Sequence, residues 1–329
     1  MALAAHLRRA LESDAVYAFK RSPSVIVAAA VTFVFLVAAF LAPWLAPHDP
    51  LNPATLNLID AFTPPRWMTG GEPRFLLGTD DQGRDLLSAI MFGARISFTV
   101  GILSVVLAMA IGISLGLIAG YAGGAVDAVI MRGADVQLSF PAILVAMLID
   151  GIARGVLGTR QHEEAAQLVL VVSIGLSCWV QYARTVRGSV MVERNKEYVQ
   201  AARIMGLPPH LIALRHVLPN VLGPVLVIAT INLAIAIVTE ATLSFLGVGV
   251  PATSPSLGTL VRVGNDFLFS GEWWILAFPA AALATLVIAV NKWDAIKEKR
   301  RALETLDERL RDSMAQVKNI SRSEEHTSE

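Results

Sequence analysis

The sequence of 329 residues contains one cysteine, Cys178, and this scarcity limits the chemistry available to the chain. One cysteine can form neither an intrachain disulfide nor a cysteine-based metal site. Charged residues are also few, at 16% of the sequence, and the formal net charge is zero. The sequence therefore has no excess of positive charge that would indicate a nucleic-acid partner.

Several catalytic motifs are missing as well. The sequence has no Gly-x-x-x-x-Gly-Lys-Ser/Thr phosphate loop, no His-Glu-x-x-His and no Gly-x-Ser-x-Gly. Its apolar stretches hold no cluster of acids of the kind that proton-coupled carriers use. These absences argue against two competing classes, a membrane-embedded enzyme and an ion-coupled secondary transporter. We expect no cofactor, no metal and no catalytic residue in this chain.

Hydrophobic residues, by contrast, make up 54% of the sequence, and the mean hydropathy is +0.58. A helix needs about 20 apolar residues to cross a bilayer. Stretches of this kind lie at residues 24–46, 96–121, 138–149 with flanks, 167–183, 221–239 and 273–290. We predict an all-α polytopic membrane protein with about six transmembrane helices. The first stretch could be a cleaved signal, but its long polar leader favours a retained helix.

The distribution of Lys and Arg predicts the orientation. Residues 184–220 carry six of them, whereas residues 248–272 carry only Arg262, so the first segment should be cytoplasmic. Both termini are then cytoplasmic, which agrees with the basic residues at 8–21 and 292–301. The predicted divisions are a tail (1–23), a first helix (24–46), an extracytoplasmic segment (47–95), a five-helix core (96–290) that contains the loop 184–220, and a tail (291–329).

The extracytoplasmic segment is rich in proline between Pro43 and Pro65, which predicts an ordered but irregular cap. It closes on Arg84-Asp-Leu-Leu-Ser-Ala-Ile-Met-Phe, a charged start followed by an apolar body. This pattern predicts a short helix in the outer interface. The alternative is an N-terminal extension of the second span.

Within the spans, small and ionisable residues stand out. Gly112, Gly116 and Gly120 recur every four residues, which favours close helix packing, and Pro141 should kink the third span. We expect Arg132 and Asp135 to pair on one face. Asp150 and Glu240 fall near outer helix ends, where we expect contact with water. Glu240 and Ser244 are candidates for lining a translocation path.

Residues 197–220 form the most informative stretch. Helix-forming residues from Met191 to Met205 should end at Gly206, and Pro208 and Pro209 prevent continuation. A second helix, from about His210 to Val217, should stop before Pro219. Two short helices across an elbow would make a rigid cytoplasmic knob, although a simple capped surface hairpin would show the same pattern. No second ligand at helical spacing accompanies His216, so a metal site is not expected.

This stretch resembles a known family. Ala201-Ala202, Gly206 and Leu218-Pro219 match the "EAA…G…LP" loop of membrane subunits of bacterial binding-protein-dependent ABC importers. Further motifs resemble the C-type permease of the dipeptide, oligopeptide and nickel branch. They are Ala42-Pro-Trp-Leu-Ala-Pro, Leu77-Gly-Thr-Asp-Asp-Gln-Gly-Arg-Asp, Gly120-Tyr-Ala-Gly-Gly, Arg215-His-Val-Leu-Pro-Asn and Glu240-Ala-Thr-Leu-Ser-Phe-Leu-Gly. Together they cover about residues 20 to 290.

The resemblance implies a type I importer permease fold in the bacterial inner membrane, with the elbow serving as a coupling helix. It implies two ATPase subunits, a second and non-identical permease, and an extracytoplasmic binding protein as partners. The cargo would be a di- or oligopeptide, with nickel chelates, glutathione or other solutes as alternatives. ATPase contacts would come from Gln200, Ala201, Ala202, Arg203, Gly206, Leu207, Pro208, His210, Arg215, His216, Leu218 and Pro219.

Two features depart from the family pattern. Gln200 stands where the family usually has Glu, so a neutral hydrogen bond would replace an ion pair with the ATPase. After Asn291 the chain predicts an amphipathic cytoplasmic helix, with Leu303, Leu306 and Leu310 on one face. Residues 322–329 resemble a translated sequencing adapter, and we expect them to carry no function.

Overall fold

The computed structural model describes residues 23–52, 56–251 and 253–292, and no β-strand occurs among them. The predicted tails at 1–22 and 293–329 lie outside the described residues. The first part of the chain forms α3 (Pro23–Phe40), α4 (Ala42–Leu45), the 3-10 helix η2 (Leu58–Asp60), α5 (Leu86–Ala122) and α6 (Gly124–Leu138). The second part forms α7 (Ala142–Glu193), α8 (Glu197–Ile204), α9 (Pro209–Ile212), the π-helix η3 (Ala213–Val217), α10 (Leu218–Phe245), α11 (Leu257–Asp266) and a last helix, Trp274–Lys292.

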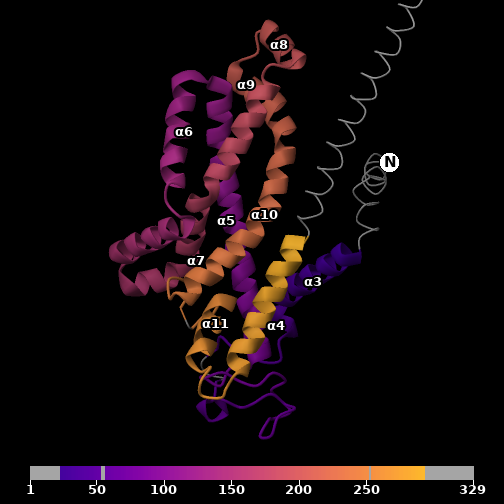
Figure 1. Ribbon diagram of the computed structural model, residues 1–329, viewed down its shortest axis with the longest axis vertical. Helices are drawn as coiled ribbons and strands as arrows, with labels where there is room; N and C mark the ends of the chain where they lie inside the picture. The colour runs from indigo at the N-terminus through magenta and orange to yellow at the C-terminus, as the bar shows by residue number, and fades with distance from the viewer. Residues whose placement is uncertain (1–22, 53–55, 252, 293–329) are drawn as a thin grey trace, which may run out of the picture.

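Among the described residues, five helices are long and apolar enough to cross a membrane, or six if one bent pair counts as a single span. The five are Pro23–Phe40, Leu86–Ala122, Gln161–Glu193, Pro209–Phe245 and Trp274–Lys292. The prediction of an all-α polytopic protein with about six spans is therefore confirmed. Figure 1 shows the long helices running side by side, with α8 and α9 at one end of the molecule and α11 near the other.

The bent pair occupies the position of the predicted third span. The helices Gly124–Leu138 and Ala142–Leu157 meet at 92°. Pro141 lies at the break and precedes the first residue of α7, because it cannot continue the hydrogen-bonding ladder of α6. The expected kink at Pro141 is therefore present, and it divides the third span into two helices.

The second span begins earlier than predicted. α5 runs without interruption from Leu86, and the Asp85 side chain caps it by accepting a hydrogen bond from the Ser88 amide at 2.9 Å. The separate interfacial helix expected within residues 84–95 is therefore wrong, and the alternative, an extension of the second span, is correct. The extension is favoured because Leu86, Ala89 and Ile90 are buried.

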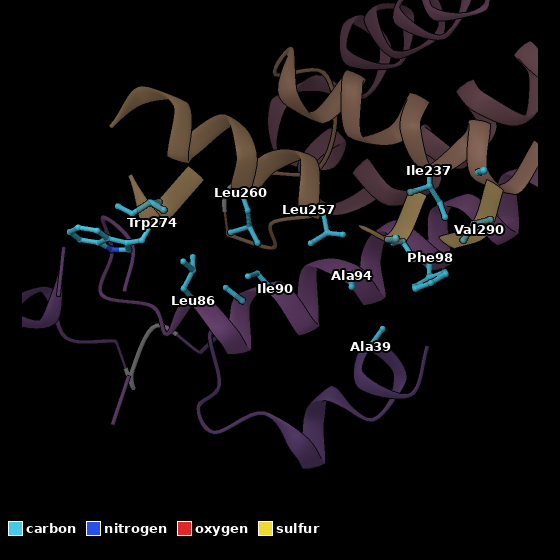
Figure 2. Close-up of a cluster of buried hydrophobic side chains, with 14 residues drawn as sticks. Ala39, Leu86, Ile90, Ala94, Phe98, Ile237, Leu257, Leu260, Trp274 and Val290 are labelled. Atoms are coloured by element: carbon cyan, nitrogen blue, oxygen red, sulfur yellow. The ribbon is translucent and has the colours of Figure 1, made fainter. Parts of the chain in front are cut away.

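These three side chains belong to a hydrophobic core near the start of α5, shown in Figure 2. The core joins α3 through Ala39, α10 through Ile237, and α11 through Leu257 and Leu260. The last helix contributes Trp274 at its start and Val290 near its end. Segments far apart in sequence are thus held together at one end of the bundle.

An irregular segment caps this end. Arg84 and Asp80 are buried in it and form an ion pair with Nε to Oδ2 at 2.6 Å. The other Asp80 oxygen accepts hydrogen bonds from the Gln82 and Arg84 amides. The Trp274 indole donates to the Thr79 carbonyl at 3.2 Å and connects the cap to the last helix. The cap is ordered but irregular, as its prolines predicted.

The glycine stripe of α5 lies against α7. A Cβ atom at Gly112 would be 2.4 Å from Tyr182 Cβ, and one at Gly116 would be 2.5 Å from the Ala183 carbonyl oxygen. Gly120 faces Val190 in the same way. Side chains at these three positions would force the two helices apart, since backbone atoms cannot move aside cheaply.

We predict that Gly116→Val lowers the free energy of unfolding of the purified protein by about 1 to 3 kcal/mol, the usual range for overpacking. The matched control is Gly188→Ala in α7, where an added Cβ meets no atom within 4 Å. That variant should be as stable as the wild type or slightly more so. Equal melting temperatures for all three proteins would contradict the packing assignment.

One predicted pair does not form. Asp135 accepts from Arg184 Nη2 of α7 at 2.5 Å, so the expected pairing with Arg132 is wrong. α6 lies against the later part of α7, where Arg187 also binds Asp127 through two guanidinium nitrogens. Asp127 and Asp135 of α6 thus pair with arginines of α7, and Asp135 does not pair with Arg132 of its own helix.

Candidate functional site

The predicted elbow consists of α8 and α9 between the ends of α7 and α10. The expected helix from Met191 to Met205 is interrupted, because α7 ends at Glu193 and α8 begins only at Glu197. Arg194, the C-terminal cap of α7, donates from Nη1 to the Gly120 carbonyl at 2.8 Å. This bond attaches the base of the elbow to the end of α5.

The turn between α8 and α9 is a Schellman motif. Gly206 has a φ of +75°, the left-handed conformation that closes many helices. The Leu207 amide donates to the Ala202 carbonyl at 3.2 Å and the Gly206 amide to the Arg203 carbonyl at 3.0 Å. Pro208 then occupies the N-cap of α9, which begins at Pro209. The predicted stop at Gly206 is therefore correct.

The second helix of the elbow does not stop before Pro219. α9, η3 and α10 follow one another without a break, and the whole stretch Pro209–Phe245 qualifies as one span. Pro219 is tolerated because it stands in the first turn of α10, where the π-helical segment has already changed the hydrogen-bonding register. α9, the second helix of the elbow, is thus an N-terminal extension of α10.

Buried side chains anchor the elbow to the bundle. Val199 and Ala202 of α8, together with Ile212 of α9, join a cluster that includes Val186 of α7 and Val221 of α10. All five residues are at most 1% exposed. Because the core of a protein is closely packed, α8 cannot move without displacing these partners.

A polar contact supplements this packing. Tyr198 Oη donates to Glu193 Oε1 at 2.6 Å and accepts from Asn220 Nδ2 at 3.0 Å. Burial, together with the hydrogen bond to Glu193, raises the pKa of the Tyr198 phenol. Asn220 also donates to the His216 carbonyl at 2.8 Å. One side chain thereby joins the end of α7, α8 and the start of α10.

The outer face of the elbow presents apolar side chains. Ile204 is 87% exposed and Met205 71% exposed, at the end of α8 beside Gly206. Gln200 is also exposed, but its amide donates to the Asn195 carbonyl at 3.0 Å within the elbow. The motif-based prediction included Gln200 and omitted Ile204 and Met205; at 3.6 residues per turn, Ile204 lies roughly opposite the buried Val199 and Ala202.

Some of the other predicted loop residues are exposed to solvent, and the rest are partly buried against the bundle. Those exposed are Ala201, Arg203, Pro208, His210, Arg215 and Pro219; Leu207, His216 and Leu218 are partly buried. Arg203 lies over the Tyr121 ring, with its guanidinium carbon 5.6 Å from the ring centroid. The elbow therefore offers a mixed apolar and basic surface above an anchored base.

Glu240 and Ser244 lie at the far end of α10. Glu240 is fully buried, and its carboxyl accepts from Ser97 Oγ at 2.7 Å and Ser244 Oγ at 2.8 Å. Asp150 is 2% exposed and pairs with Arg154 and His162. The expectation that these carboxyl groups contact water is wrong, because side chains from other parts of the chain surround them.

The bundle and its anchored elbow define the class: this is a membrane-spanning transport permease, which is not itself an enzyme. The chain belongs to the family described as "binding-protein-dependent transport system inner membrane component", whose model matches residues 112–302. Residues 12–65 match the "N-terminal TM domain of oligopeptide transport permease C". It is therefore a multi-span inner-membrane subunit of an ABC importer, a system that includes an ATPase and a binding protein.

Curated relatives agree with this family. The chain is 38% identical to a di/tripeptide transport system permease protein of Pseudomonas aeruginosa, over 77% of this chain and 79% of the relative. It is 38% identical to a dipeptide permease of Escherichia coli, over 83% and 86%. It is 32% identical to an oligopeptide permease of Bacillus subtilis, over 85% and 86%.

A solved structure shares the fold. A chain of the MetNI methionine ABC transporter, in an inward-facing conformation, matches with a TM-score of 0.50 and 20% identity. The match covers 65% of this chain and 95% of that chain. The importer permease fold expected from the sequence is confirmed.

Proposed function

We propose that this permease carries short peptides across the inner membrane, and that the elbow is where the ATPase acts on it. The observation that carries the proposal is an exposed apolar tip, Ile204 and Met205, on a helix anchored to α7 and α10. Exposed apolar side chains of this size suit a protein partner. The three curated relatives described above are named for peptide transport.

The anchoring explains how force would be transmitted. A helix moves as a body, and α8 is bonded to both spans through Tyr198, Glu193 and Asn220. A push on the tip would therefore tilt α7 and α10 together. Displacement at α10 reaches Glu240, which accepts from Ser97 of α5 and from Ser244 one turn further along α10. For Glu240 and Ser244 we propose a positioning role in the translocation path.

The proposed complex has two ATPase subunits, this permease, a second and non-identical permease, and a binding protein outside the membrane. The elbow and both termini face the cytoplasm, and the cap that precedes α5 faces the binding protein. Charge supports this orientation, since residues 184–220 hold six Lys and Arg residues. Nickel chelates and glutathione remain alternative cargoes for the same architecture.

Disulfide cross-linking tests the ATPase contact. In a Cys178→Ala background, Met205→Cys should cross-link to a cysteine introduced in the surface groove of the ATPase subunit, and ATP should change the yield. The control is Phe269→Cys, which is 98% exposed in the segment after α11. It should give no product. Cross-linking of the control but not of Met205→Cys would overturn the proposed orientation and coupling site.

A further inference from the structure

A polar cavity of about 310 Å³ lies between α7, the loop after α10, and α11. Its lining includes Arg154, His162 and Glu163 of α7, Gly247 of the loop, and Arg262 of α11. Gly247 lies just beyond the C-terminal end of α10, whereas the elbow lies before its N-terminal end. At 1.5 Å per residue, the 28 residues of α10 separate the cavity from the elbow by roughly 40 Å.

Buried polar contacts fix the walls of this cavity. Asp150 accepts from Arg154 Nε at 2.8 Å and lies 3.0 Å from His162 Nε2, and both Asp150 and His162 are nearly inaccessible. Arg154 also donates from Nη2 to the Gly247 carbonyl at 3.1 Å. The two parts of α7 and the loop after α10 are therefore held in one arrangement, and the charges of Asp150 and Arg154 offset each other.

Two charges in the lining have no such compensation. Within the described ranges, neither Arg262 nor Glu163 takes part in a hydrogen bond or an ion pair. The Arg262 guanidinium lies against Gly247, where a Cβ atom would come within 2.8 Å of Nη1. The lack of a side chain at Gly247, whose φ is +80°, leaves room for that guanidinium beside the cavity.

An unpaired cation and an unpaired anion lining one cavity suit a ligand with both charges. We propose that this cavity binds a zwitterionic short peptide, with its carboxylate at Arg262 and its ammonium at Glu163. A guanidinium binds a carboxylate through charge-assisted hydrogen bonds, and a carboxylate binds an ammonium in the same way. This inference rests on the proposed function and adds a site for the cargo in the permease itself.

The test measures binding of labelled dialanine to the full permease and ATPase complex in nanodiscs, without the binding protein. Wild-type complex should bind dialanine about tenfold more tightly than either N-acetyl-dialanine or dialanine amide, because each cap removes one charge. Arg262→Gln should lose only the preference over the amide. Glu163→Gln should lose only the preference over the acetylated form. Asp266→Asn, one turn along α11 and outside the lining, should keep both preferences.

Uptake of dialanine in proteoliposomes with the binding protein separates the two proposals. Uptake without measurable binding in nanodiscs, or binding indifferent to both caps, would overturn the cavity site and leave the peptide importer intact. A complex that hydrolyses ATP but never takes up dialanine would overturn the peptide function, and the cavity site with it. Equal loss of both preferences in either variant would also refute the assigned orientation.

Discussion

Ile204→Asp should reduce ATP-dependent uptake at least tenfold while leaving the permease folded. Ile204 is 87% exposed in the isolated chain, so aspartate there disturbs no core contact. In the proposed complex the same side chain is buried against the ATPase, where an isoleucine contributes about 1.5 to 3 kcal/mol. An unpaired carboxylate in that contact would cost still more, since it must be removed from water. Uptake and stimulated ATPase activity in proteoliposomes measure the effect.

The matched control for this prediction is Ile204→Leu, which keeps the volume and the apolar character. It should transport at close to the wild-type rate, whereas Ile204→Asp should copurify with less ATPase. Melting temperatures of the three permeases should agree within about 2 °C, because surface substitutions rarely change stability by more than about 0.5 kcal/mol. Normal uptake by Ile204→Asp would remove the tip of α8 from the coupling site.

Local chemistry was enough to predict the parts of the elbow that depend on sequence neighbours. Gly206 adopts a left-handed conformation and Pro209 starts the next helix, as the Gly-Leu-Pro-Pro order indicates. The bend at Pro141 follows from the same kind of local rule. Continuous apolar stretches of about 20 residues likewise predicted the five clear spans.

Contacts between residues far apart in the sequence could not be predicted from the sequence. Glu240 lies near a helix end and appeared accessible to water, but Ser97, 143 positions earlier, covers it. Asp135 pairs with Arg184, 49 positions later, rather than with its neighbour Arg132. A sequence periodicity indicates which face of a helix is apolar, but it does not say which helix packs there.

The uninterrupted start of α5 and the exposure of Ile204 have the same explanation. The apolar residues after Arg84 are compatible with an interfacial helix, and only the surrounding α10, α11 and last helix decide that they are buried. Isoleucine is a residue type that is usually buried, yet Ile204 is exposed because Val199 and Ala202 occupy the buried face of α8. In both cases the tertiary partners determine burial.

The Arg84 and Asp80 pair supports the strongest stability prediction. Arg84 is 1% exposed, and its Nε lies 2.6 Å from Asp80 Oδ2 beneath the outer cap. Arg84→Met should destabilise the protein by about 3 to 5 kcal/mol, because it leaves a buried carboxylate without its counter-charge. Thermal unfolding in detergent, followed by tryptophan fluorescence, would report this loss through Trp274, which donates to Thr79 beside the pair.

The double variant Asp80→Asn with Arg84→Met separates charge from packing. It removes both charges while the asparagine oxygen can still accept from the Gln82 and Arg84 amides. It should recover most of the stability lost in Arg84→Met, since replacing a whole buried pair is often nearly neutral. A double variant as unstable as the single one would show that the Arg84 side chain stabilises the cap by packing.

The pH dependence of Arg84→Met gives an independent check. Burial, followed by repulsion from Asp80, raises the pKa of Asp81, and the charge of Arg84 opposes this shift. Without Arg84 the folded-state pKa of Asp81 should rise further above its unfolded value. A folded state that binds the proton more tightly becomes more stable as the pH falls through that pKa. Arg84→Met should therefore recover part of its lost stability when acidified, and a deficit that stays constant with pH would mean that uncompensated charge is not the cause.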